Sequence, residues 1–82
     1  MLHKFPYYSV EFSTPDDDVF RVPFQDEKHA VDLFDSVVLS DERIPRVSVF
    51  HVDPGVVHEI RRKETYAWRQ AVERAHAEEG EV

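Results

Sequence analysis

The sequence predicts a small α+β domain with an antiparallel sheet of three or four strands and two helices on one face, in the order ββαββα. Three observations support this. Apolar and polar residues alternate in segments that are typical of half-buried strands. In two other segments the apolar residues recur at helical spacing. The two halves of the 82-residue chain also resemble each other, because the apolar positions of the first half recur 38 or 39 residues later.

The first half begins with two predicted strands. Residues alternate from Tyr7 to Thr14 and again from Val19 to Phe24, and Thr14-Pro15-Asp16-Asp17-Asp18 between them has the composition of a turn. Pro23 has no backbone N–H to donate, so we expect the second strand to lie at a sheet edge or to face solvent at that residue. The pair is predicted to form a β-hairpin whose inward residues include Phe20, Val22 and Phe24.

A helix is predicted for residues 27–39. Asp26 is a favourable N-cap, and Pro45 follows the polar segment that ends the helix. The apolar residues of this segment fall at i, i+3, i+4, i+7 and i+8, on one helix face. They are Ala30, Leu33, Phe34, Val37 and Val38.

The second half begins with a predicted strand over Arg46–Val52, and two interpretations follow it. Val56–Lys63 is a fourth strand after a turn at Pro54-Gly55, or one long helix runs from 54 to about 78 and gives the order ββαβα. Gly55 early in such a helix disfavours it, and the match between the halves favours the hairpin. In the hairpin, His51 faces His58, and Ile60 and Arg62 share the inward side.

The last segment, Thr65–Ala77, is predicted to be helical on either interpretation. Its apolar residues again form one face, which we expect to be buried against the sheet or the first helix. Residues 77–82 are expected to be a frayed tail. The buried face would consist of Trp68, Ala71, Val72 and Ala75.

Composition excludes several function classes. The net charge is −7, and residues 1–45 hold ten Asp/Glu against four Lys/Arg, so a nucleic-acid-binding protein is not expected. The absence of cysteine excludes disulfides and thiolate chemistry, and two glycines are too few for a phosphate-binding loop. We expect no enzyme activity, no cofactor, no membrane partner and a cytoplasmic location. The excess of Arg and Val, without Asn, indicates a bacterial or phage origin.

The outer face of the predicted sheet indicates a function. If both helices cover the other face, Tyr7, Phe50, Val52 and Val57 lie in water, and exposed apolar groups mark interaction surfaces. Two alternatives are a bulge that turns Phe50 and Val52 inward, or a cover formed by residues 1–6. The hypothesis is a small, acidic, soluble, non-catalytic module that binds a protein partner or a second copy of itself through this face.

Two other functions compete with this hypothesis. His51 and His58 could hold a metal ion together with a carboxylate, and Arg61–Lys63 is the one basic cluster, so a metal- or anion-responsive module is the first alternative. No regular metal-ligand spacing reinforces the histidine pair, and two rings at the rim of a thin core explain it better. The second alternative is an acidic mimic of nucleic acid formed by the first half of the chain.

Overall fold

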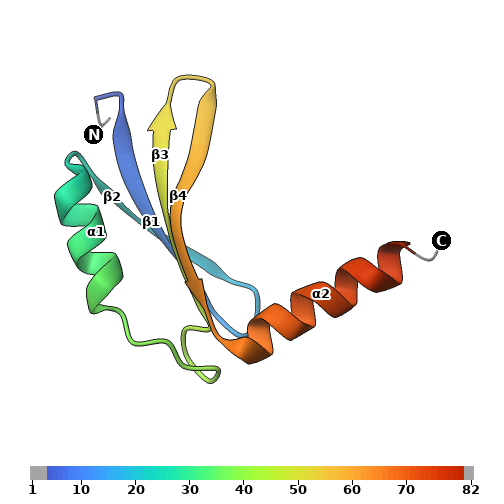
Figure 1. The fold of residues 1–82 in the computed structure, drawn as a ribbon. Coiled ribbons are helices and arrows are strands. Elements are labelled where there is room, and N and C mark those ends of the chain that lie inside the picture. The colour runs from blue at the N-terminus through green and yellow to red at the C-terminus, as the bar shows by residue number, and fades with distance from the viewer. Residues whose placement is uncertain (1–3, 81–82) are drawn as a thin grey trace.

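The computed structural model describes residues 4–80 and has a four-stranded sheet with two helices (Figure 1). The strand order is β2-β1-β3-β4, and every neighbouring pair is antiparallel. The predicted order ββαββα is therefore confirmed, and residues 56–63 are strand. The elements are β1 (Tyr7–Ser13), β2 (Val19–Phe24), α1 (Glu27–Ser36), β3 (Arg46–Asp53), β4 (Val56–Glu64) and α2 (Tyr66–Gly80).

The first hairpin joins β1 to β2, and its turn is closed by Thr14. The Thr14 backbone N–H donates to the Asp18 carbonyl (2.9 Å), and its Oγ1 accepts from the Asp18 N–H (3.1 Å). Asp17 has a positive φ of 67°, a conformation that Asp tolerates better than most residues. β2 lies at the sheet edge, as Pro23 predicted. Its inward residues are less buried than expected, since Phe20 is 59% and Val22 37% exposed.

The core lies between α1 and the two central strands, β1 and β3. Ala30 and Phe34 of α1 pack against Val10, Val47 and Val49, and all five are buried. Tyr8, Phe12, Phe24, Leu33, Val37 and Leu39 surround this cluster. The helix ends at Ser36, earlier than the predicted residue 39, because the C-cap residue Val37 is already extended. As a result Val38 is 84% exposed and does not belong to the apolar stripe.

The second hairpin closes through the two-residue turn Pro54-Gly55, where Gly55 has a positive φ of 80°. The predicted pair His51↔His58 is present, but a bulge on β4, opposite the step from Val49 to Phe50 on β3, leaves Ile60 without a partner. A bulge adds one residue to one strand and so reverses its alternation beyond that point. The expected inward position of Arg62 is therefore wrong, and Ile60 is the unpaired residue of the bulge.

After the bulge it is Arg61 and Lys63 that lie on the α1 side, opposite Val49 and Val47. Lys63 Nζ donates to the Val37 carbonyl (2.8 Å) and lies 4.8 Å from the centre of the Phe34 ring. Arg62 and Glu64 fall on the opposite side of the sheet. The one extra residue of the bulge thus decides which charged side chains of β4 lie on the same side of the sheet as the core.

The second helix leads away from the sheet (Figure 1). Thr65 alone separates it from β4 and caps it, because Thr65 Oγ1 accepts from the Trp68 N–H (3.2 Å) while the Thr65 N–H donates to the Pro45 carbonyl (2.8 Å). Within 66–77 only Trp68 and Gln70 are half-buried and the rest are exposed. The predicted burial of Ala71, Val72 and Ala75 is therefore wrong, and only α1 covers a sheet face.

One connecting residue is too short to turn a helix back across the sheet. The α1 side of β4, on which α2 would have to pack, also carries the polar side chains of His58, Arg61 and Lys63. The structure has α2 running to Gly80, and residues 81 and 82 of the expected frayed tail lie outside the described residues.

Candidate interaction surface

The sheet face away from α1 brings together the four apolar residues that the sequence singled out. Tyr7 pairs with Val52, and Val52 pairs with Val57, at the end of the sheet next to the Pro54-Gly55 turn. Phe50 lies on the same strand, β3, two residues before Val52. Val57 is 60% exposed and the other three are half-buried. We call Tyr7, Phe50, Val52 and Val57 the hairpin-end patch.

Of the two alternatives for the patch, the bulge is wrong, and of the cover by residues 1–6 only residues 4–6 lie within the described part of the chain. The bulge of the second hairpin lies on β4, at Ile60, so Phe50 and Val52 keep their outward side. In the segment before β1, the Phe5 ring lies 5.7 Å from the Tyr7 ring but Phe5 is itself 54% exposed. Phe5 therefore enlarges the apolar surface.

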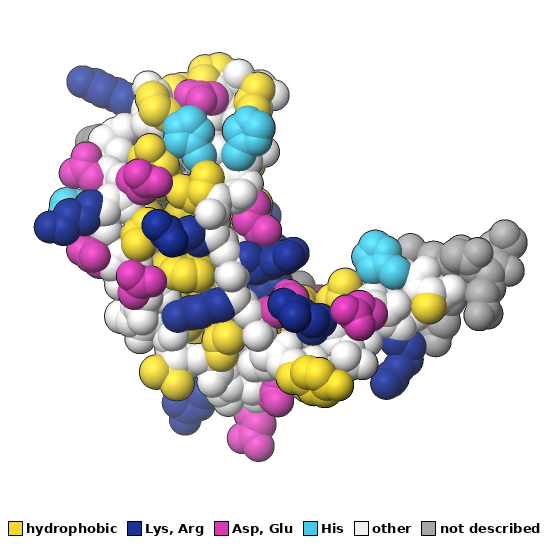
Figure 2. All heavy atoms as spheres, in the orientation of Figure 1, with side chains coloured by type: hydrophobic (Ala, Val, Ile, Leu, Met, Phe, Trp, Pro, Cys, Tyr) yellow, Lys and Arg dark blue, Asp and Glu magenta, His cyan; other side chains and the backbone are white. Residues whose placement is uncertain are grey.

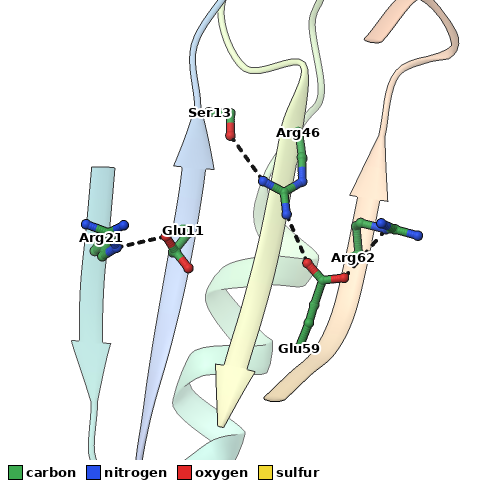
Figure 3. A network of polar contacts seen from close by, with 6 residues as sticks. All are labelled: Glu11, Ser13, Arg21, Arg46, Glu59 and Arg62. Carbon is green, nitrogen blue, oxygen red and sulfur yellow. Dashed lines mark hydrogen bonds and ion pairs between the residues drawn. The ribbon is translucent and has the colours of Figure 1, made fainter. Parts of the chain in front are cut away.

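Ion pairs occupy the centre of this face (Figure 3). Arg46 Nη2 donates to Glu59 Oε2 (3.0 Å), and Arg62 Nε lies 3.7 Å from Glu59 Oε1. On the neighbouring strands Arg21 Nε donates to Glu11 Oε1 (2.8 Å). These side chains are part-exposed, so each pair stabilises the fold by about 0–1 kcal/mol. Because Arg46 and Arg62 share Glu59, these ion pairs leave the middle of the face with one excess positive charge.

Small residues lie beneath these long side chains. Ser9, Ser13 and Ser48 are buried on the same face, and Arg46 Nη1 reaches Ser13 Oγ at 3.5 Å. Among the described residues Ser48 Oγ has no hydrogen-bond partner. Because serine side chains are small and polar, the centre of the face has little apolar surface, and the large apolar side chains lie toward its ends.

At the other end of the face, α2 presents an open apolar stripe. Trp68, Ala71, Val72 and Ala75, which we call the α2 stripe, line two hollows of about 230 and 220 Å³. Arg46, Arg62 and Glu64 complete the first hollow, and Asp17 of the β1–β2 turn completes the second. The stripe thus points toward the strand ends without closing on them.

The histidine pair lies on the α1 side of the sheet. His51 and His58 are cross-strand partners, the Tyr8 ring lies edge-on to His51 at 5.2 Å, and His51 Nδ1 is 3.5 Å from Asp53 Oδ2. Within residues 4–80 no three His, Asp or Glu side chains are grouped so that they could hold a metal ion. Aromatic packing accounts for the position of His51.

The basic cluster is divided between the two faces. Lys63 bonds to α1, Arg62 points to the outer face, and Arg61 is exposed on the α1 side. Because Arg62 lies on the other face and Lys63 bonds to the Val37 carbonyl, the three cations do not form one anion-binding surface.

The sequence did not reveal the roles of Arg46 and Trp68. Arg46 was placed only at the start of a strand, and its pairing with Glu59 depends on the β3–β4 register and its bulge. Trp68 was expected to be buried. The single residue between Glu64 and Tyr66 is the signal that could have indicated a helix leading away from the sheet.

The chain matches no known protein-family model, no curated protein and no solved structure. Among the described helices none combines the length and the apolar character that crossing a bilayer requires. The surface geometry is therefore the basis of the functional argument.

Proposed function

We propose that this chain is a non-catalytic protein-interaction module of the cytoplasm, a bacterial or phage accessory protein that docks a protein through its outer sheet face. The observation that carries the proposal is the gathering of Tyr7, Phe50, Val52 and Val57 at one end of a face that no described helix covers. Aromatic and aliphatic side chains in such a patch gain free energy when a partner excludes water from them.

The distribution of charge supports a protein partner for this face. The arginines Arg21 and Arg46 are each paired with a glutamate of their own chain, so the face offers little free charge to a polyanion. The acidic excess lies elsewhere, in the β1–β2 turn and on α1. A docking surface with apolar side chains and mostly paired charges suits a folded protein better than a nucleic acid as its partner.

Affinity purification from the native host tests the proposal with three tagged baits: the wild type, Val57→Asp and Val38→Asp. Val57 is in the hairpin-end patch, whereas Val38 is equally apolar and 84% exposed, and it follows Val37, whose carbonyl accepts from Lys63 near the opposite end of β4. We expect the wild type and Val38→Asp to retain the same partner, or an untagged copy of the chain, and Val57→Asp to retain about tenfold less. Equal recovery with all three baits, or no retained protein, would overturn the proposal.

A further inference from the structure

The molecule exposes more surface than a compact chain of its size. Its accessible surface is 6118 Å², whereas a compact 9.7 kDa protein exposes about 5,100 Å². Its radius of gyration is 14.3 Å, against about 11.7 Å for a compact domain of 82 residues. The excess of about 1,000 Å² is close to the roughly 800 Å² that one partner buries in a standard protein interface. The single chain thus has the surface of one half of an assembly.

α2 projects from the rest of the molecule (Figure 2). α2 has 15 residues, and isolated helices of that length are marginal in water unless an apolar face is packed. Its stripe is open, with Val72 40% exposed and Trp68 half-buried. Within residues 4–80 no other element packs over this stripe, so a partner that covered it would stabilise the helix.

The two open apolar surfaces lie at opposite ends of one sheet face. The hairpin-end patch is beside the Pro54-Gly55 turn, and the α2 stripe is beside the Arg46↔Glu64 pair at the other end of β3 and β4. The strand from Val57 to Glu64 spans roughly 23 Å, which is close to the length of α2, about 22 Å. Between the two ends lie the paired charges of Glu59, Arg46 and Arg62.

We infer that the partner is a second copy of this chain, with the two outer faces stacked antiparallel about a two-fold axis. The inference rests on the proposed function. Antiparallel stacking exchanges the two ends of the face, so each hairpin-end patch meets the α2 stripe of the other copy. Both contacts are formed at once, and the two-fold axis closes the assembly at two chains. Because most charges at the centre are paired within each copy, the stacking opposes two regions that carry only one excess positive charge each.

A pair of charge variants tests this contact in the full chain. Val57→Lys places a cation in the hairpin-end patch, and Val72→Asp places an anion in the α2 stripe. Both side chains are exposed, so neither variant removes a core contact, and circular dichroism of each confirms that it folds. In either homodimer the introduced charge opposes an apolar surface at both contacts. In a mixed dimer the introduced lysine faces the introduced aspartate at one contact, and the other contact is wild-type.

Analytical ultracentrifugation gives the result. We expect the wild type and the control Val38→Asp to be dimers, each single variant to dimerise about tenfold more weakly or worse, and an equimolar mixture of the two variants to recover the dimer. A mixture that stays monomeric, or single variants that stay dimeric, would overturn the inference.

A second outcome separates this inference from the proposed function. If the wild type sediments as a monomer while the host purification still retains a different protein in a Val57-dependent manner, the second copy is wrong and the interaction module stands. If neither experiment shows an interaction, both are wrong.

Discussion

The two ββα units of this protein have the same order of elements but different fates for their helices. Both helices carry an apolar stripe, yet α1 packs onto β1 and β3 whereas α2 leads away into solvent (Figure 1). α1 follows β2 through a loop and presents the large side chains Leu33 and Phe34. α2 follows β4 after Thr65 alone, and two of the four residues of its stripe are alanines, which bury little area. An apolar stripe therefore does not fix where a helix packs.

The strand beneath each helix adds to the difference. α1 rests on valines, whereas the α1 side of β4 offers His58, Arg61 and Lys63. Burying α2 on these charged groups would cost more than its small apolar residues return. The second unit therefore contributes its two strands to the sheet, while its helix stays mostly exposed.

The largest expected effect is a difference between the two helices in how much one large side chain contributes to the free energy of unfolding. Phe34→Ala should lower the free energy of unfolding by about 3–5 kcal/mol, because Phe34 is 8% exposed and lies in the core. Trp68→Ala should cost less than about 1.5 kcal/mol, because Trp68 is only half-buried beside open hollows. Urea denaturation of both variants in a Val57→Lys background excludes self-association from the comparison. Equal losses would contradict the difference between the helices.

A smaller effect tests the link between β4 and the first unit. Lys63→Met keeps the packing of the side-chain stem but removes the ammonium that bonds to the Val37 carbonyl and lies over Phe34. We expect a loss of about 1–2 kcal/mol in the free energy of unfolding. Arg61→Met, two residues earlier on the same side and exposed, should change it by less than about 0.5 kcal/mol. If the two variants lost equally, Lys63 would have no special role.

The smallest effect compares the two turns. Gly55→Ala should cost about 1 kcal/mol, since φ is +80° there and only backbone strain opposes the added methyl group, which meets no atom within 4 Å. Asp17→Gly, at φ 67°, should raise stability by no more than about 0.5 kcal/mol, because relief of strain is offset by the greater freedom of the unfolded chain. Paired thermal and urea denaturation curves measure both. A stabilising Gly55→Ala would show that the turn tolerates an L side chain.

Much of the fold could be predicted because its signals are local. The residue pattern identified the first three strands, and the i, i+3, i+4 spacing identified both helices. For residues 56–63 the match between the two halves favoured the second hairpin, with its His51↔His58 pair, over one long helix. The four residues of the hairpin-end patch were also placed on one face correctly, because alternation alone assigns faces along a strand.

The sequence by itself thus determined the first three strands, the two helical segments and the faces of the strands up to the first irregularity, and it left residues 56–63 open between strand and helix. Only the tertiary structure decided the bulge at Ile60, which moved Lys63 inward and Arg62 outward, and the direction of α2. The physical reason is that periodicity is a property of each segment by itself. The position of a bulge and the surface on which a helix packs depend on contacts between segments that are distant in the sequence. Val10, Val47, Val49 and α1 filled the one available core, and the stripe of α2 was left open.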